Sequence, residues 1–335
     1  MRSTTALLSL TLLVGCLGSS RGSPPARSAF APRCETAAFR EEAPFDAVYQ
    51  KACHNCYERG LSPSLGAALD RVHNIEIDFW DQDGLFAGGR PHAWYVRHAA
   101  FGGNENNCSG RGDLEACLGD VRAWSDAHPG HDVVTVYLDK KQGWGNGRRP
   151  IDLDTLLAGV FSNGAIVTPG ELKGTHATLR AAAEAQAWPH MDALKGRLLF
   201  VLTGGGLVSA NGSLHDYVAE RGANATAFVA PGVDDEREVA GAPDHFDQGT
   251  AAWTVFYNLD KNAAHLGGVV REHHYVARVW GTGEAAPIDR ASLSRCVNVV
   301  AHDRLDGTPS DVHGLLVQDA RPSEQAVIER GGRRE

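Results

Sequence analysis

The sequence predicts an α/β protein with one parallel sheet, open or closed into a barrel. Strand-like apolar runs alternate with helix-like stretches, and no long linker interrupts them from residue 45 onward. The chain has 335 residues, enough for one large domain, because an α/β barrel typically needs about 250 residues. Hydrophobic residues make up 43% of the chain, which indicates a globular protein rather than a disordered one.

The expected strands of this sheet follow one another along the chain with helices between them. They are, in order, residues 48–54, 74–80, 94–98, 132–139, 197–203, 254–257, 275–280, 297–301 and 314–317. The expected helices are residues 63–72, 114–127, 153–161 and 179–187. The strand at 132–139 is rich in β-branched residues, and the strand at 197–203 lacks polar alternation, as buried parallel strands do.

The N-terminus has the features of an export signal. Arg2 precedes an apolar run at residues 6–14, which is too short to span a bilayer. The run leads to Cys16 in a context that resembles a bacterial lipobox, so a lipidated cysteine is the favoured interpretation. An ordinary signal peptide, cleaved after Ala29 or Ala31, is the alternative.

Four segments are therefore expected. They are residues 1–16 as a lipoprotein-type signal peptide, 17–44 as a tether, 45–322 as a single folded domain and 323–335 as a frayed tail. We expect an exported protein, either anchored to a membrane as a lipoprotein or secreted. The formal net charge of −9 argues against nucleic acid as a partner. It also argues against electrostatic docking on anionic lipid, and nothing in the sequence indicates a protein partner.

The cysteine count predicts disulfides. Of the seven cysteines, six remain once Cys16 is set aside, an even number in an exported chain. Cys108 and Cys117 flank a short polar loop and form the predicted pair. The other four can pair in three ways, and they are Cys34, Cys53, Cys56 and Cys296. A zinc or redox role for Cys53 and Cys56 is disfavoured because the chain has no second pair of ligands at suitable spacing.

Polar side chains gather where the first four predicted strands end. They are His54, Asn55, Glu76, Asp78, His98, Asp139 and Lys141. Glu76 and Asp78 share one face of their strand, because strand side chains alternate. In a parallel barrel the carboxyl ends of the strands meet at one mouth, where catalysis occurs. A single histidine at a strand end is usually structural, so the prediction depends on all four ends being polar together.

Two carboxylates on one buried face repel each other unless a cation compensates them. Calcium prefers several oxygen ligands, and Asn55, Glu76, Asp78 and Asp139 would supply them. Magnesium is the second choice of metal. Pairing of the carboxylates with Arg97 or Arg278 is the alternative that needs no metal.

Several segments, in order, resemble motifs of the phosphatidylinositol-specific phospholipases C. They are HNCY at residues 54–57, IEIDFWD at 75–81, WYVRH at 94–98, VVTVYLD at 133–139, LKGRLL at 194–199 and RVW at 278–280. The first two are the most specific. The resemblance implies a distorted TIM-type (β/α)8 barrel in a single domain, and a phospholipid membrane surface as substrate.

The resemblance also implies a reaction. The inositol 2-hydroxyl attacks the phosphodiester, diacylglycerol leaves and a cyclic inositol phosphate forms. His54 and His98 would be the acid–base pair, since the pKa of imidazole lies near neutrality. Ca²⁺ would be held by the four oxygen ligands named above, and substrate would be bound by Lys141, Arg278 and Trp280.

Asp78 selects a branch within this family. Metal-free bacterial relatives carry an arginine at the matching position, so an aspartate there favours the metal-dependent branch. Asp139 stands where a glutamate is usual, and is one methylene shorter. Val201 and Thr203 replace lysines that bind extra ring phosphates in eukaryotic members, which favours plain phosphatidylinositol as substrate.

Three other functions remain open at the level of sequence. A glycerophosphodiester phosphodiesterase or sphingomyelinase D-like enzyme would share the barrel, but the His-Arg-Gly typical of those enzymes is absent at residues 54–56. A non-catalytic lipoprotein that binds lipid head groups is the alternative from another class. A nucleotide-binding protein is a further alternative, because a strand is followed by Gly204, Gly205 and Gly206, as in phosphate-binding loops. These glycines lack the Gly-Lys-Ser/Thr ending of such loops and are better explained as a turn.

Overall fold

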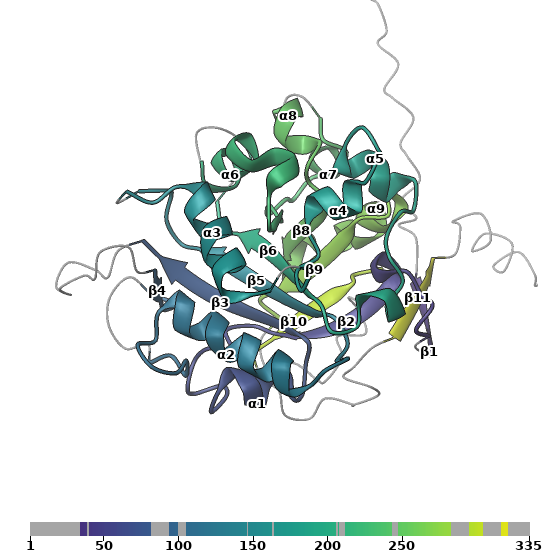
Figure 1. Ribbon diagram of the computed structural model, residues 1–335. Coiled ribbons are helices and arrows are strands. Elements are labelled where there is room, and N and C mark those ends of the chain that lie inside the picture. Colours follow the sequence, from purple (N-terminus) through teal and green to yellow (C-terminus); the bar gives the residue numbers. More distant parts are fainter. Residues whose placement is uncertain are drawn as a thin grey trace, which may run out of the picture. The chain divides into compact units, whose positions relative to one another are not determined.

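The computed structural model describes residues 34–38, 40–81, 94–99, 105–145, 147–162, 164–205, 207, 212–242, 247–282, 295–303 and 316–320. Its parallel strands are β2 (Val48–Cys53), β3 (Asn74–Trp80), β5 (Val134–Lys140), β6 (Leu198–Thr203), β7 (Phe228–Val229), β8 (Phe256–Asp260), β9 (Val276–Trp280) and β10 (Val299–His302). Neighbouring strands pair along the chain from β2 to β7 and from β8 to β10, and β10 returns to pair with β2 (Figure 1).

The ring closes between β7 and β8, where pairing is weakest. A single parallel bridge joins Val229 to Thr254, and the amide of Asn258 donates to the carbonyl of Pro231 at 2.9 Å. Because β7 has only two residues, it cannot form a longer ladder with its neighbour. The predicted distorted TIM-type barrel in a single domain is thus confirmed.

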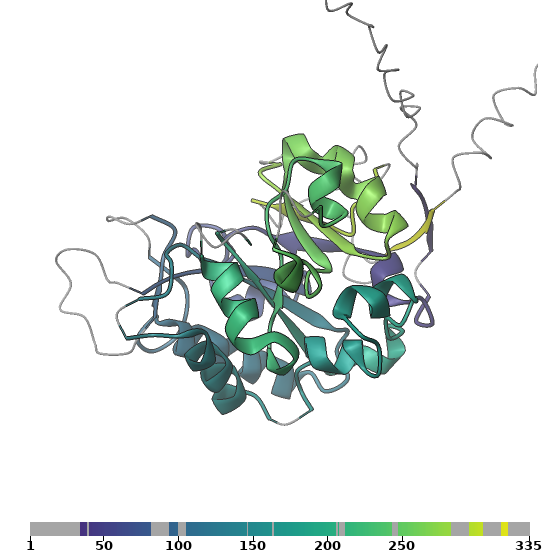
Figure 2. The ribbon, with the colours of Figure 1, turned by 90° about the horizontal axis from the view of Figure 1, so that it is seen from above.

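Helices lie around the outside of the strands (Figure 2). They are α1 (Leu65–Leu69), α2 (Leu114–Ala127), α3 (Pro150–Val160), α4 (Pro169–Lys173), α5 (Leu179–Glu184), α6 (Ser213–Arg221), α7 (Glu236–Val239), α8 (Gln248–Ala251) and α9 (Gly267–Glu272). In α2 the side chain of Asp113 caps the first turn by accepting from the amide of Ala116. Its residues Leu114, Leu118 and Val121 are buried at the spacing of one helix face.

Two predicted strands do not belong to the barrel, so their assignment to the parallel sheet was wrong. β4 (Tyr95–Val96) pairs antiparallel with the end of β3. β2 ends at Cys53, opposite Ile75, and the edge of β3 beyond that point is open to β4. β11 (Leu316–Ala320) pairs antiparallel with β2 and with β1 (Cys34–Ala38), outside the ring. β1 lies within residues 17–44, the segment expected to be a tether.

Three disulfides join the six cysteines. The predicted Cys108–Cys117 bond is present. Cys34–Cys296 ties β1 to the segment before β10, and Cys53–Cys56 spans the end of β2. Disulfides of this number indicate a protein that folds in an oxidising compartment, as exported proteins do. Among the described residues, no helix is both long enough and apolar enough to cross a membrane.

Candidate active site

Three carboxylates converge at the carboxyl ends of β3 and β5. Asp78 lies in register with Asp139 on the neighbouring strand, and Asp139 in turn with Thr203 on β6. Glu76 is two residues earlier on β3, on the same face and one layer deeper. One oxygen from each of the three carboxylates lies within 4.8 Å of the others. Strand alternation and parallel pairing therefore produce the acidic cluster that the sequence predicted.

Glu76 is neutralised from inside the barrel by Arg278. The guanidinium of Arg278 is 1% exposed and donates to Glu76, to Asn258 Oδ1 at 2.6 Å, and stacks at 4.6 Å over Tyr137. Burial alone would raise the pKa of Glu76. The charges of Arg278, His54 and Lys141 outweigh it, so the net pKa is lowered and the carboxylate stays ionised.

Asp78 is fully buried between His98 and Lys141. Its Oδ2 lies 3.0 Å from His98 Nδ1 and 2.9 Å from Lys141 Nζ. Burial raises the pKa of Asp78 to about 6; the charges of Glu76 and Asp139 add to the rise, and the bonds to His98 and Lys141 oppose it. The hydrogen bond that His98 donates to Asp78 in turn raises the pKa of His98, whose side chain is 49% exposed.

His54 follows β2 and lies next to Glu76, whereas His98 contacts Asp78. Its Nδ1 lies 2.5 Å from Asp303 Oδ1, and its Nε2 lies 4.0 Å from Glu76 Oε2. The ring stacks on Trp280 with centroids 6.0 Å apart. Asp303 directly follows β10, which pairs with β2, and the sequence analysis missed it. The signal that could have identified Asp303 is its position directly after β10, a strand of the same sheet.

Buried oxygens at the carboxyl ends of β2 and β3 fit a hard divalent cation. Asn55 Oδ1 and Asp78 Oδ1 are both buried and have no hydrogen-bond partner among the described residues. Asn55 has a φ of 59°, a left-handed conformation that asparagine tolerates, and it lies inside the Cys53–Cys56 loop. Buried oxygens without donors beside three carboxylates are the ligand set that calcium prefers.

Gly204, which directly follows β6, packs against this cluster. Gly204 has a φ of +82°, and a Cβ there would lie 2.6 Å from Asp139 Oδ1 and would also strike the carbonyl of Lys140. Thr203 Oγ1 donates to Asp139 Oδ1 at 3.1 Å. The sequence analysis missed this supporting contact. The phosphate-loop interpretation is not needed, since the glycine is required for close approach to a site residue.

On the outer face of the same strands, a second buried ion pair holds the strand ends. Lys140 Nζ lies 2.7 Å from Asp81 Oδ1, which also accepts from Trp94 Nε1 at 2.8 Å. Lys140 thus points away from the cluster, whereas Asp139 and Lys141 point toward it. Because Asp81 follows β3 and Trp94 precedes β4, this hub fixes three segments that carry site residues.

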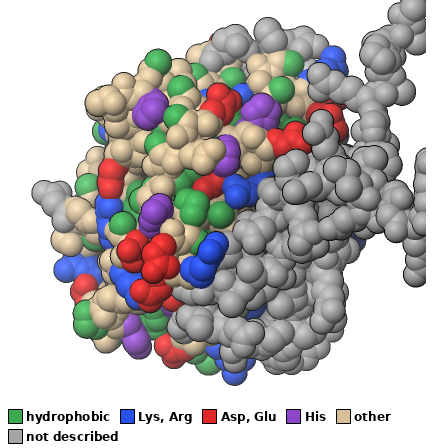
Figure 3. All heavy atoms as spheres, turned by 90° about the vertical axis from the view of Figure 1, so that its right-hand side faces the viewer, with side chains coloured by type: hydrophobic (Ala, Val, Ile, Leu, Met, Phe, Trp, Pro, Cys, Tyr) green, Lys and Arg blue, Asp and Glu red, His purple; other side chains and the backbone are tan. Residues whose placement is uncertain are grey.

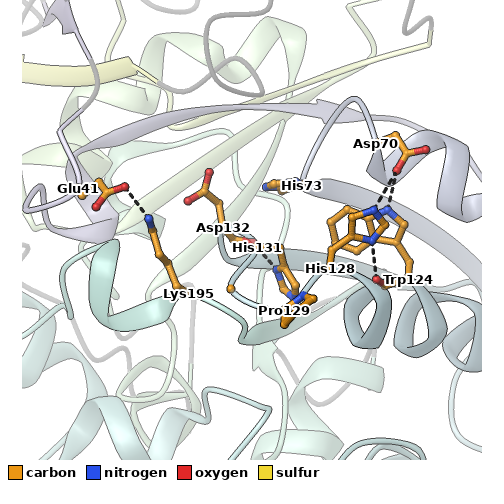
Figure 4. Close-up of a pocket in the computed structure, with 10 residues that line it drawn as sticks. Glu41, Asp70, His73, Trp124, His128, Pro129, His131, Asp132 and Lys195 are labelled. Carbon is orange, nitrogen blue, oxygen red and sulfur yellow. Dashed lines mark hydrogen bonds and ion pairs between the residues drawn. The ribbon is translucent and has the colours of Figure 1, made fainter.

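A separate cavity of about 610 Å³ lies at the other end of the barrel, beside the amino ends of β3, β5 and β6. Figure 3 views the molecule from that side and shows acidic, basic and histidine side chains interspersed on the described surface. Figure 4 shows the lining, which includes Trp124, His128, His131 and the Glu41–Lys195 ion pair. This cavity is remote from the acidic cluster and is not part of the candidate active site.

The fold and the site together define a parallel-barrel enzyme with an oxygen-rich cation site at the carboxyl ends of its strands. The family described as phosphoinositide phospholipase C, Ca²⁺-dependent, matches residues 105–224. The calcium-dependent phosphoinositol-specific phospholipase C of a Pseudomonas species, solved as a myoinositol complex, is 34% identical. Its TM-score is 0.75, with 82% of this chain and 95% of that chain covered.

A Ca²⁺-dependent phosphatidylinositol-specific phospholipase C from Streptomyces antibioticus is 24% identical, with a TM-score of 0.66. The match covers 83% of this chain and 100% of that chain, and at this identity it supports the fold alone. No match was found among curated proteins. From the Pseudomonas match and the family match, the chain belongs to the calcium-dependent phosphoinositide phospholipase C family.

Proposed function

We propose that the protein cleaves phosphatidylinositol to diacylglycerol and a cyclic inositol phosphate, with His54 and His98 as the acid–base pair. The observation that carries this proposal is the acidic cluster at the carboxyl ends of β3 and β5, with His54 beside Glu76 and His98 bound to Asp78. A phosphodiester seated over the cluster would meet both imidazoles, and membership of the family supplies the substrate class.

The reaction needs two proton transfers on opposite sides of the phosphorus. One imidazole takes the proton of the inositol 2-hydroxyl as its oxygen bonds to phosphorus. The other returns a proton to the diacylglycerol oxygen as the phosphorus–oxygen bond breaks. Asp303 holds the His54 ring through Nδ1 and leaves Nε2 facing the cluster. Asp78 holds His98 through Nδ1 from within the cluster, which leaves Nε2 of His98 for the substrate. These carboxylates orient the rings and stabilise their protonated forms.

Calcium would be held by Asn55, Glu76, Asp78 and Asp139. When bound, it makes the 2-hydroxyl more acidic and neutralises negative charge that develops on the phosphoryl oxygens. The buried oxygens of Asn55 and Asp78 that lack donors support this ligand set. Magnesium suits the site less well, because it demands a stricter octahedral arrangement than this set of side chains offers.

We infer that Trp280 stacks on the inositol ring at the mouth, beside His54. Arg278 acts from beneath by keeping Glu76 ionised, since its guanidinium is buried against that carboxylate. The substrate is presented at a phospholipid membrane surface. In the exported protein, lipidation at Cys16 would keep the barrel at that surface, and residues 17–33 would serve as the tether.

The proposal is tested by ³¹P NMR of phosphatidylinositol vesicles incubated with the purified mature protein, with calcium and then with a chelator. We expect cyclic inositol phosphate only with calcium. Cyclic product that still forms after chelation would support the proposed reaction but contradict its dependence on calcium. Release of a glycerol phosphate would instead indicate the glycerophosphodiesterase alternative, and no cleavage of any phospholipid would favour a head-group-binding protein.

A further inference from the structure

Lys141 lies within the acidic cluster, between two of its carboxylates. Its Nζ lies 2.9 Å from Asp78 Oδ2 and 2.5 Å from Asp139 Oδ2. It directly follows β5, and alternation places it on the same face as Asp139. The ammonium therefore bridges two of the three carboxylates that would hold a metal ion.

A lysine and a divalent ion cannot both hold these oxygens at full strength. Calcium binds carboxylate oxygens at about 2.3–2.6 Å, so an ion held by Asp78 and Asp139 would lie only about 3–5 Å from an ammonium that holds Oδ2 of the same two carboxylates. At that distance like charges repel strongly in a partly buried site. One cation must leave the shared oxygens when the other binds.

The two protein cations of the site differ in their freedom to leave. Arg278 is 1% exposed and is held by Glu76, Asn258 and Tyr137 inside the barrel. Lys141 has 22% of its side chain exposed and a flexible four-carbon stem. Arg278 can remain in place on Glu76, whereas Lys141 can swing toward the open mouth.

We propose that Lys141 is an internal competitor for calcium, displaced from Asp78 and Asp139 when the ion binds. This inference rests on the proposed calcium site. It makes calcium affinity weaker than the oxygen ligands alone would give. By linkage, each cation weakens the hold of the carboxylates on the other to the same degree. Displacement also releases a positive charge at the mouth, next to the position proposed for the substrate phosphate.

The first test is calcium binding by titration calorimetry at about pH 8, where carboxylates are ionised. Lys141→Met removes the charge but keeps the length, and we expect calcium to bind about tenfold more tightly or better. Lys141→Arg keeps the charge and should bind within a few-fold of wild type. Lys195→Met, at the amino end of the barrel, is the matched control and should not change the affinity.

An affinity in Lys141→Met that is equal to or weaker than wild type would overturn the inference while leaving the calcium site intact. A wild-type protein that binds no calcium would instead overturn the proposed metal site. The two failures are therefore distinguishable.

A second test uses the unmodified chain, so it does not depend on a variant that folds. Acetic anhydride labelling of lysine, read by tandem mass spectrometry, compares protein with calcium and with chelator. We expect Lys141 to label several-fold faster with calcium, because its ammonium is released. Lys140, buried against Asp81, and Lys195 are internal controls whose labelling should not change. Equal labelling of Lys141 in both conditions contradicts displacement.

Discussion

The two ends of the barrel use the same residue types and arrange them in opposite ways. At the carboxyl ends, three carboxylates converge and buried oxygens of Asn55 and Asp78 lack donors among the described residues. At the amino ends, charged groups are paired locally. Lys195 binds Glu41 at 2.5 Å, and both ring nitrogens of His131 have partners at 2.6 and 2.7 Å.

This difference shows why composition alone does not identify a site. Within the described residues, the only group of three or more histidine, cysteine or acidic side chains with converging ligand atoms is at the carboxyl end. The amino-end cavity has histidines and carboxylates as well, but its ion pairs and hydrogen bonds are local, such as His128 with Asp70 and His131 with Ser125. Convergence of oxygens that have no partner, rather than the presence of ionisable groups, distinguishes the two ends.

The largest effect is expected when histidines at the two ends of the barrel are substituted and compared. His98 and His128 have side chains that are each 49% exposed, and each faces an aspartate. His98→Ala or His54→Ala should lower the rate of cyclic inositol phosphate formation by about 10²–10⁴-fold, the usual contribution of a positioned acid or base. His128→Ala should keep the wild-type rate. Initial rates measured by ³¹P NMR test this prediction. Near-wild-type rates in both the His54 and the His98 variants would contradict their catalytic roles.

A smaller effect is expected when an aspartate at each end of the barrel is substituted and the stabilisation by calcium is compared. Calcium at about 100 times its Kd should stabilise the wild-type protein by about 2.7 kcal/mol, because it binds only the folded state. Asp78→Asn should lose most of this gain, since it removes the negative charge of a buried ligand. Asp132→Asn, beside the amino-end cavity, should keep it. Thermal melts with calcium and with chelator measure the gain, and an Asp78→Asn protein that is stabilised as much as wild type contradicts the ligand assignment.

The smallest effect is expected when two glycines with the same backbone conformation are each replaced by alanine. Gly204 and Gly164 both have a φ of +82°, but a Cβ at Gly164 would have nothing within 4 Å. Gly164→Ala should therefore cost only the strain of a left-handed alanine, about 1–2 kcal/mol. Gly204→Ala carries the same strain and in addition pushes Asp139 away, so calcium affinity and rate should each fall by about tenfold. Calorimetry and melts on both variants separate strain from displacement, and equal calcium affinities would show that the close approach is unimportant.

Local pattern predicted a large part of the barrel and of its site. Residues 74–80 were predicted as a strand with Glu76 and Asp78 on one face, and β3 has those bounds. Residues 114–127 were predicted as a helix, and α2 has those bounds. Such segments are long enough for their period to show. β7 has two residues and α7 and α8 have four each, too few for any periodic signal.

The sequence by itself determined where the chain alternates, which side chains share a strand face, and that six cysteines would pair. The tertiary structure decided which groups meet across the barrel. Arg278 reaches Glu76 over 202 residues, Asp303 reaches His54 over 249, and Cys34 bonds to Cys296 over 262. These contacts arise when β10 closes on β2 and the barrel interior brings opposite strands together. No local periodicity encodes such long-range contacts, because they depend on the strand register of the whole barrel.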